Sequence, residues 1–167
     1  NGINGAVHRW STARRVPSSD GPTLRRSAGA RWRDKAERFV WDAVPLEVGA
    51  IHAPHAVRTG RRLIERERPA VLWTTSYPVS AHLVGLALHR STGVPLVVDL
   101  RDPWTLNFLF DRKPAPAQWL ERRLEAEVFR AAARVVVTTE TLAAEYATMY
   151  PELARKFVAV RNSFDPM

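Results

Sequence analysis

The chain contains no cysteine, and this absence excludes both a disulfide framework and a thiolate metal site. It also lacks any run of about 18 apolar residues, so no membrane-spanning helix is expected. Its first five residues have neither the charged nor the apolar part of a signal peptide, and no initiator Met precedes them. We therefore expect a cytoplasmic location, and we expect the chain to be a fragment of a longer protein.

Several catalytic motifs are missing as well. Neither G-x-G-x-x-G nor G-x-x-x-x-G-K-[ST] occurs, which argues against a dinucleotide fingerprint and a P-loop. No G-x-S-x-G elbow occurs, which argues against a serine hydrolase. The five histidines show no paired spacing with carboxylates on one helix, so no metal site is expected. Asp99 and Asp102 are three positions apart, unlike the D-x-D of aspartyl-phosphate enzymes.

Positive charge is present, and it is concentrated near the start of the chain. Residues 1–40 contain nine basic and three acidic side chains, which is +6 of the total net charge of +8. Such a segment attracts anions: nucleic acid, anionic lipid or a phosphorylated substrate. It can equally be a solvated segment with no partner. Because its sequence is rich in Gly, Ser and Pro, we treat residues 1–40 as a basic, partly irregular segment.

From about residue 55 the sequence alternates between helix and strand patterns. Continuous apolar runs are typical of strands buried on both faces, and they occur at 70–75, 95–100, 134–138 and 157–160. Helical patterns occur at 55–68, 79–92, 117–133 and 140–149. This alternation predicts βαβ units. We expect one α/β domain over residues 41–166, with an open doubly wound parallel sheet and helices on both faces.

Polar side chains follow the second predicted strand, where ligands of such sheets bind. On a strand Asp99 and Arg101 point to the same side, so they can pair. Asp102 lies where the strand gives way to a loop, so its carboxylate can act as a general base towards an alcohol. Arg101 can also clamp a phosphate. Trp104 can stack on a sugar or anchor the loop, and a turn braced by an Asp–Arg pair explains the residue types equally well.

The other strand ends carry candidate residues too. Ser76 and Ser80 lie between the first strand and the next helix, where hydroxyls and free N–H groups attract phosphate or sugar. The alternative is that they merely cap that helix. Glu140 follows the third strand with the same two interpretations, and Asn162 follows the fourth.

Four segments of the chain resemble the N-terminal domain of family 4 glycosyltransferases, which have the GT-B fold. The segments are 68–80, 93–104, 134–142 and 156–165, and they occur in the family's order. The second matches the pattern "g.P.v.d.RD.W", although Arg101 stands where many relatives have His. The fourth matches "kv.vipNG.D", with Ser163 in place of the common Gly. Each motif alone is weak, and their order and spacing together carry the resemblance.

The resemblance implies a retaining enzyme that moves a sugar from a nucleotide-sugar to a lipid-linked or polysaccharide acceptor, without a metal or another cofactor. It implies that Asp102 is the acceptor-side base or orienter. It implies a substrate-binding role for Ser76, Ser80, Asp99, Arg101, Trp104, Glu140 and Asn162. The family's donor-binding C-terminal domain has no counterpart in this sequence, so the chain alone is expected to be catalytically incomplete. Peripheral contact with the anionic inner face of the membrane is a further expectation.

Two other functions remain open at this point. One is a non-catalytic α/β module that binds a phosphorylated or sugar ligand. The other is nucleic-acid binding through residues 1–40. It ranks last, because the chain shows no aromatic–basic alternation of the kind found in RNA-binding sheets.

Overall fold

The computed structural model describes residues 48–108 and 110–162. A short 3-10 helix, η2 (Val48–His52), leads directly into α2 (Ala53–Glu67). Three strand–helix units follow: β1 (Leu72–Thr75) with α3 (Ser80–Thr92), β2 (Leu96–Leu100) with α4 (Ala115–Ala131), and β3 (Arg134–Val137) with α5 (Glu140–Met149). The last strand is β4 (Phe157–Ala159), and the 3-10 helices η3 (Phe110–Arg112) and η4 (Pro151–Lys156) precede α4 and β4. Residues 1–40 lie outside the described residues, so their separation from the domain stays a prediction.

Local backbone conformation and hydrogen bonds define the end of α3 and the start of α5. Gly93 has a φ of 74°, and its N–H donates to the carbonyl of His89 at 2.8 Å, which closes α3 with a left-handed residue. At the start of α5, the hydroxyl of Thr139 accepts from the N–H of Leu142 at 3.1 Å, the usual role of an N-cap threonine. These signals are local, and the predicted helices at 79–92 and 140–149 agree with α3 and α5 to within one residue.

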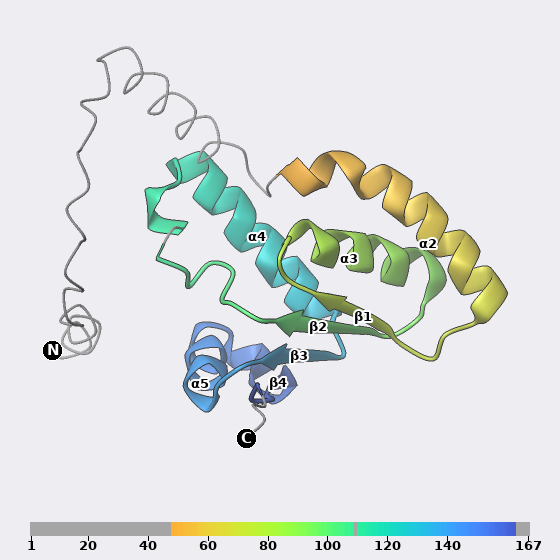
Figure 1. Cartoon of the computed structure of the whole chain (residues 1–167). Helices are drawn as coiled ribbons and strands as arrows, with labels where there is room; N and C mark the ends of the chain where they lie inside the picture. Colours follow the sequence, from red (N-terminus) through yellow and green to blue (C-terminus); the bar gives the residue numbers. More distant parts are fainter. Residues whose placement is uncertain (1–47, 109, 163–167) are drawn as a thin grey trace, which may run out of the picture. The chain divides into compact units, whose positions relative to one another are not determined.

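The four strands form one parallel sheet in the order β1-β2-β3-β4 (Figure 1). Leu72 is in register with Leu96, and Val135 with Phe157. The open parallel α/β sheet is therefore confirmed. All four strands end at the same edge, which places the segments after β1, β2, β3 and β4 along one rim of the domain.

The hydrophobic core lies on one face of this sheet. Side chains alternate between the two faces of a strand. The face with Val98 and Val135 packs against α3, α4 and α5 through one cluster that includes Leu86, Phe129 and Tyr146. On the opposite face, Trp73 remains 58% exposed.

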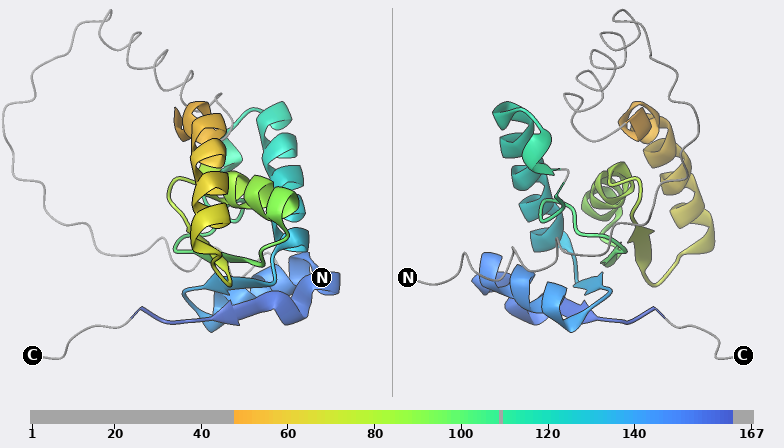
Figure 2. Two further views of the ribbon diagram at one scale, coloured as in Figure 1. Left: turned by 90° about the vertical axis from the view of Figure 1, so that its right-hand side faces the viewer. Right: turned by 60° about the vertical axis from the view of Figure 1, so that its left-hand side comes forward.

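The packing of the helices on one face of the sheet follows from the strand order. Each crossover moves to the same side of the previous strand, so right-handed connections place every helix on the same face. Two further views show α2, α3 and α4 on one side of β1 and β2 (Figure 2). We expected helices on both faces, and the part of the chain that the structure describes supplies them on one face only.

The helix α3 lies very close to the sheet, and α2 packs on α3. A Cβ atom added at Gly85 would lie 2.5 Å from Cγ2 of Thr74 and 2.9 Å from Cδ1 of Leu96, so only glycine allows this approach. A Cβ added at Gly60 in α2 would meet Cδ1 of Leu88 at 2.8 Å. None of the helices in the described residues is both long and apolar enough to cross a bilayer.

Candidate functional site

The loop that follows β2 is anchored to the core through Trp104. Its indole side chain is buried, and the ring centroid lies 6.2 Å from that of His82. The backbone N–H of Trp104 donates to the hydroxyl of Tyr146 at 2.9 Å, and its Nε1–H donates to Glu121 at 3.3 Å. Of the two roles open to Trp104 from the sequence, the loop anchor describes its position in the structure.

The next residue, Thr105, is held by a buried carboxylate of α4. Its N–H and its hydroxyl donate to Glu125 at 3.0 and 2.8 Å. The hydroxyls of Tyr146 and Tyr150 donate to the same carboxylate at 3.2 and 2.8 Å. Burial raises the pKa of Glu125, and the four hydrogen bonds oppose that shift. Burial and the neighbouring carboxylate raise the pKa of Tyr146 and of Tyr150.

Sequence reasoning missed these two glutamates as loop anchors. No role was assigned to Glu121 and Glu125 from the sequence. In the structure both are buried, and Glu121 forms an ion pair with Lys113. A signal was available: both glutamates lie at helical spacing from Val128 and Phe129, which are apolar and buried. Carboxylates that fall on the apolar face of a helix need buried donors, and the loop supplies them.

Between Leu100 and the anchored Trp104, the loop presents Arg101 and Asp102 to solvent. Leu100 before them is buried in β2 and Trp104 after them is buried in the core, whereas both charged side chains are exposed. The predicted pairing of Asp99 with Arg101 is wrong, because no ion pair joins them among the described residues. The strand ends at Leu100 and the chain bends at Arg101, so the alternation of a strand no longer applies there.

Asp99 lies on the face of the sheet opposite to the core. It is half-buried, and it is in register with Thr75 and Val136. Its backbone carbonyl accepts from the N–H of Ser76 at 3.1 Å, which joins two of the predicted site residues.

The two candidate serines, Ser76 in the β1–α3 loop and Ser80 at the first residue of α3, are both buried. Neither caps α3, because the N-cap position is Val79 and no side chain bonds there. Within the described residues, Oγ of Ser76 has no hydrogen-bond partner. The neighbouring Tyr77 accepts a hydrogen bond from the side chain of Asn107 at 3.1 Å. This bond connects the β1–α3 loop to the loop that carries Asp102.

A buried histidine, His82, lies in the first turns of α3. Its Nδ1 is 2.9 Å from the hydroxyl of Thr74, and its Nε2 has no partner among the described residues. Burial lowers the pKa of His82 to about 4, although the negative charge of Asp99 raises it. The imidazole is therefore neutral at neutral pH. Sequence reasoning considered the histidines only as metal ligands and did not identify this residue.

The two remaining candidates are exposed at the rim. Glu140 is the first residue of α5, directly after the cap residue Thr139, and Asn162 follows β4. Across residues 48–108 and 110–162, no group of three His, Asp or Glu side chains is placed to hold a metal ion.

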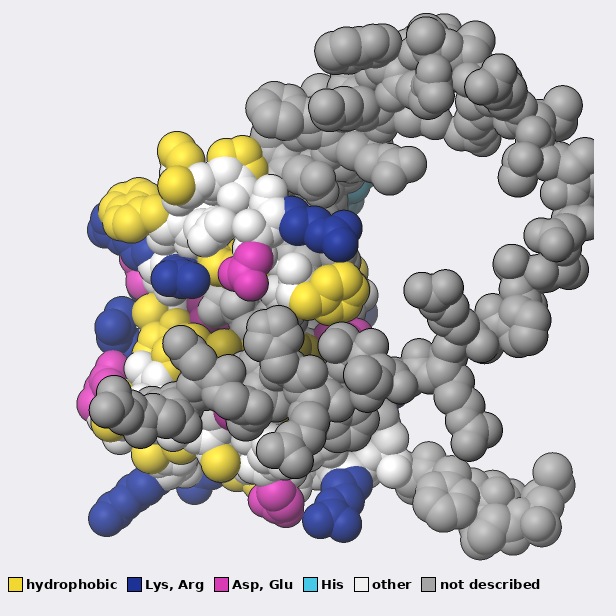
Figure 3. Space-filling model, turned by 90° about the vertical axis from the view of Figure 1, so that its left-hand side faces the viewer, with side chains coloured by type: hydrophobic (Ala, Val, Ile, Leu, Met, Phe, Trp, Pro, Cys, Tyr) yellow, Lys and Arg dark blue, Asp and Glu magenta, His cyan; other side chains and the backbone are white. Residues whose placement is uncertain are grey.

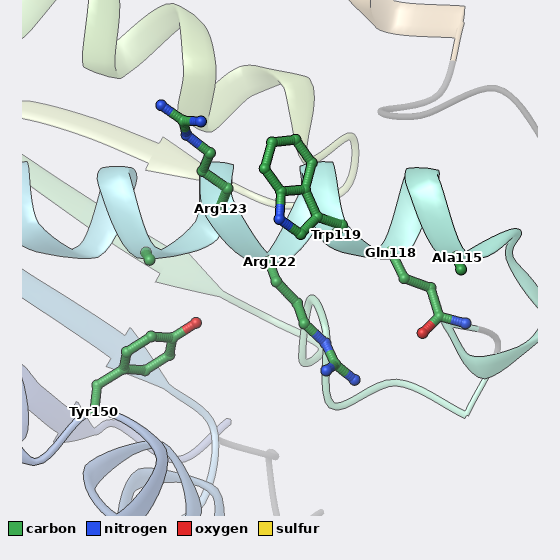
Figure 4. A pocket seen from close by; sticks show the side chains of 7 residues that line it. Ala115, Gln118, Trp119, Arg122, Arg123 and Tyr150 are labelled. Atoms are coloured by element: carbon green, nitrogen blue, oxygen red, sulfur yellow. The ribbon is translucent and has the colours of Figure 1, made fainter.

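A separate hollow of about 490 Å³ lies on α4, and none of the predicted site residues lines it. Trp119 and Arg123 extend from one side of the helix, and Gln118 and Arg122 extend from the other (Figure 4). Tyr150, at the end of α5, closes one side of the hollow.

Comparison with known proteins provides the family. A family model described as a glycosyl transferase 4-like domain matches residues 6–162. This range includes all four strands and every helix described above. A comparison with curated proteins found no match. On the strength of the family match, together with the parallel α/β sheet, the chain belongs to the family of glycosyl transferase 4-like domains.

Proposed function

We propose that this chain is the acceptor-side domain of a retaining GT-B glycosyltransferase, which moves a sugar from a nucleotide-sugar to a lipid-linked or polysaccharide acceptor. Membership of the family supports a role in glycosyl transfer. The observation that carries the finer proposal is the position of Asp102: it is exposed at the rim, between a core strand and the anchored Trp104. A carboxylate held by fixed neighbours is suited to orient a substrate hydroxyl.

In this proposal Asp102 orients the acceptor hydroxyl and accepts its proton as the acceptor oxygen bonds to the anomeric carbon. The bond from that carbon to the nucleotide phosphate breaks on the same face of the sugar, so that the configuration is retained, and the nucleotide leaves with both electrons. The exposed guanidinium of Arg101 is suited to a phosphate or carboxylate. Asp99, Glu140 and Asn162 contribute further polar groups along the rim. The nucleotide-sugar is the co-substrate, and no metal or other cofactor takes part.

The buried candidates have a different role in this proposal. Ser76, Ser80 and Trp104 are each buried, so we assign them to the floor beneath the exposed residues. There they shape the binding surface and hold its loops in place.

The test is an Asp102→Asn substitution in the full-length enzyme that carries this domain, assayed for sugar transfer. We expect a loss of roughly 10²- to 10⁴-fold in turnover, the usual contribution of a general base. The matched control is Asp111→Asn, since Asp111 is an exposed aspartate in the neighbouring η3. Unchanged turnover in Asp102→Asn would exclude Asp102 as the base. If the full-length protein binds sugar or phosphate ligands without any transfer, the binding-module alternative replaces this proposal.

We also propose a cytoplasmic location with peripheral contact to an anionic membrane. The basic segment 1–40 was the sequence basis for that contact, and it lies outside the described residues.

A further inference from the structure

Two exposed aromatic side chains lie near the start of α4, and each is accompanied by an arginine. Phe108 is 72% exposed, and the guanidinium of Arg112 lies 6.0 Å from its ring centroid. Trp119 is 62% exposed, and the guanidinium of Arg123 lies 5.6 Å from its ring centroid. Soluble proteins scatter single apolar residues over their surface, but a repeated pairing of aromatic ring and cation is a more specific arrangement.

The segment with η3 packs on the first turns of α4, so both pairs lie beside the N-terminal half of this helix. The guanidinium of Arg122 lies 5.2 Å from the ring centroid of Phe110. The side chain of Gln118 donates to the carbonyl of Lys113 at 2.8 Å. We call this surface the aromatic–arginine face and define it by Phe108, Arg112, Trp119, Arg122 and Arg123. Figure 3 views the molecule from the left-hand side of Figure 1, where α4 begins, and shows apolar side chains beside Lys and Arg side chains, with Asp and Glu side chains among them.

The exposed charges of this face are mostly positive and mostly unpaired. Lys113 and Glu121 satisfy each other, and Arg123 lies 3.6 Å from Glu127. Among the ion pairs of the described residues, none includes Arg112 or Arg122. The hollow between Trp119 and Arg122 opens on the same stretch of α4 (Figure 4). It therefore combines an apolar wall with two guanidinium groups, and that of Arg122 belongs to no ion pair among the described residues.

We propose that the aromatic–arginine face docks on an anionic lipid bilayer. Trp and Phe side chains favour the boundary between head groups and acyl chains, and arginine can place its charge among the lipid phosphates while its stem stays in the apolar layer. Anionic lipid attracts each such cation. The inference deepens the membrane contact proposed above. It rests on Phe108 and on residues of η3 and α4, and it depends neither on residues 1–40 nor on sugar transfer.

The helix α2 provides the comparison that makes the proposal specific. It is also rich in exposed arginine, including the adjacent pair Arg61 and Arg62. However, its sequence contains no aromatic ring other than His55, and it packs on α3 through Gly60. Charge alone would make α2 and α4 equivalent, whereas the proposed docking uses α4.

The first experiment measures partition of the whole chain onto vesicles of phosphatidylcholine with phosphatidylglycerol, at about 0.1 M salt. We expect Arg122→Gln with Arg123→Gln to lower partition roughly thirtyfold, because each arginine near the surface contributes roughly five- to sixfold. The control, Arg61→Gln with Arg62→Gln, should lower it much less. Equal losses in the two double variants would overturn the proposal, and so would equal partition onto pure phosphatidylcholine.

The second experiment reports which tryptophan meets the lipid. Vesicles with brominated acyl chains quench the fluorescence of an indole that enters the boundary region. We expect Trp119→Phe to remove a quenched component, and we expect Trp73→Phe, which removes a similarly exposed indole, to retain it. A quenched fraction that Trp119→Phe leaves unchanged would overturn the proposal.

A soluble acceptor separates this inference from the proposed function. In the full-length enzyme, the Arg122→Gln, Arg123→Gln variant should transfer sugar to a water-soluble acceptor at the unaltered rate while it loses vesicle binding. Vesicle binding that depends on Trp119 would stand even if the Asp102→Asn test contradicted the proposed base.

Discussion

The backbone N–H and the hydroxyl of Thr105 both donate to the carboxylate of Glu125, at 3.0 and 2.8 Å, across 20 residues of sequence. Helix α4 thus holds the loop that presents Asp102, three residues before Thr105. The position of Asp102, the candidate base, therefore depends on the buried carboxylate of Glu125, which does not itself lie at the rim.

Replacing Glu125 by Ala should destabilise the fold by about 3 kcal/mol or more. The substitution leaves Thr105, Tyr146 and Tyr150 with buried donors that have lost their acceptor. Urea unfolding of the whole chain measures the effect. Glu127→Ala is the control, because Glu127 forms only surface ion pairs and should cost about 0–1 kcal/mol. Similar losses in both variants would show that the Glu125 network adds no stability.

The two tyrosines that contact Glu125 should differ in their contributions. Tyr146→Phe removes the acceptor of the Trp104 N–H as well as a donor to Glu125, so we expect a loss of about 2 kcal/mol. Tyr150→Phe removes one donor at a half-buried position and should cost about 1 kcal/mol. Amide exchange at Trp104 provides the specific readout: it should accelerate in Tyr146→Phe and stay slow in Tyr150→Phe.

The close approach of α3 to the sheet predicts an asymmetry between two glycines. Gly85→Ala should destabilise by about 1–3 kcal/mol, because the new methyl group would overlap Thr74 and Leu96 in the sheet. Gly60→Ala should cost less or be neutral. Its only close neighbour is the flexible end of Leu88, and alanine favours the helix by up to about 1 kcal/mol. Thermal unfolding of the two variants measures the difference, and a larger loss at Gly60 would contradict this packing.

The buried imidazole predicts a loss of stability in acid. The pKa of His82 is lowered to about 4 in the fold, from 6.5 in the unfolded chain. Between these values the unfolded chain binds the additional proton, so stability falls as the pH drops from about 6.5 to about 4. The contribution amounts to about 3 kcal/mol. Unfolding at pH 7 and pH 4 measures it, and His82→Gln should flatten the profile by that amount. An unchanged profile would mean that His82 does not titrate in this range.

The order of strands and helices was predictable because its signals are local. Apolar runs of four to six residues, Gly93 after α3 and Thr139 before α5 each act within one turn or one strand. The family and the open parallel sheet followed from these segments and were confirmed. Which face of the sheet the helices pack on was not predictable in the same way, because an apolar run does not show which of its two faces will contact a helix.

Only the location of the candidate site, at the ends of the strands, was predictable from the sequence, and the arrangement of its side chains was not. Exposure of Arg101 and Asp102 depends on where β2 ends, and a shift of one residue reverses the side to which a side chain points. That is why the expected pairing of Asp99 with Arg101 fails. The anchoring by Glu125 requires that the loop reach α4, and contacts of this length are not encoded in local spacing.

The strand order also bears on how the domain forms during synthesis. Among the described residues, each of β2, β3 and β4 pairs with the strand made just before it, and the most distant registered pairs, those of β2 with β3, join residues 134 − 97 = 37 positions apart. A ribosome releases about 5–20 residues per second, so each strand can dock on its predecessor within seconds of emerging. For a parallel sheet, whose pairings usually demand slow closure of long loops, this arrangement keeps contact order low. The domain can therefore assemble vectorially, one strand and one helix at a time, and the carboxyl-edge loop with Asp102 becomes fixed only when Tyr146 of α5 has been made.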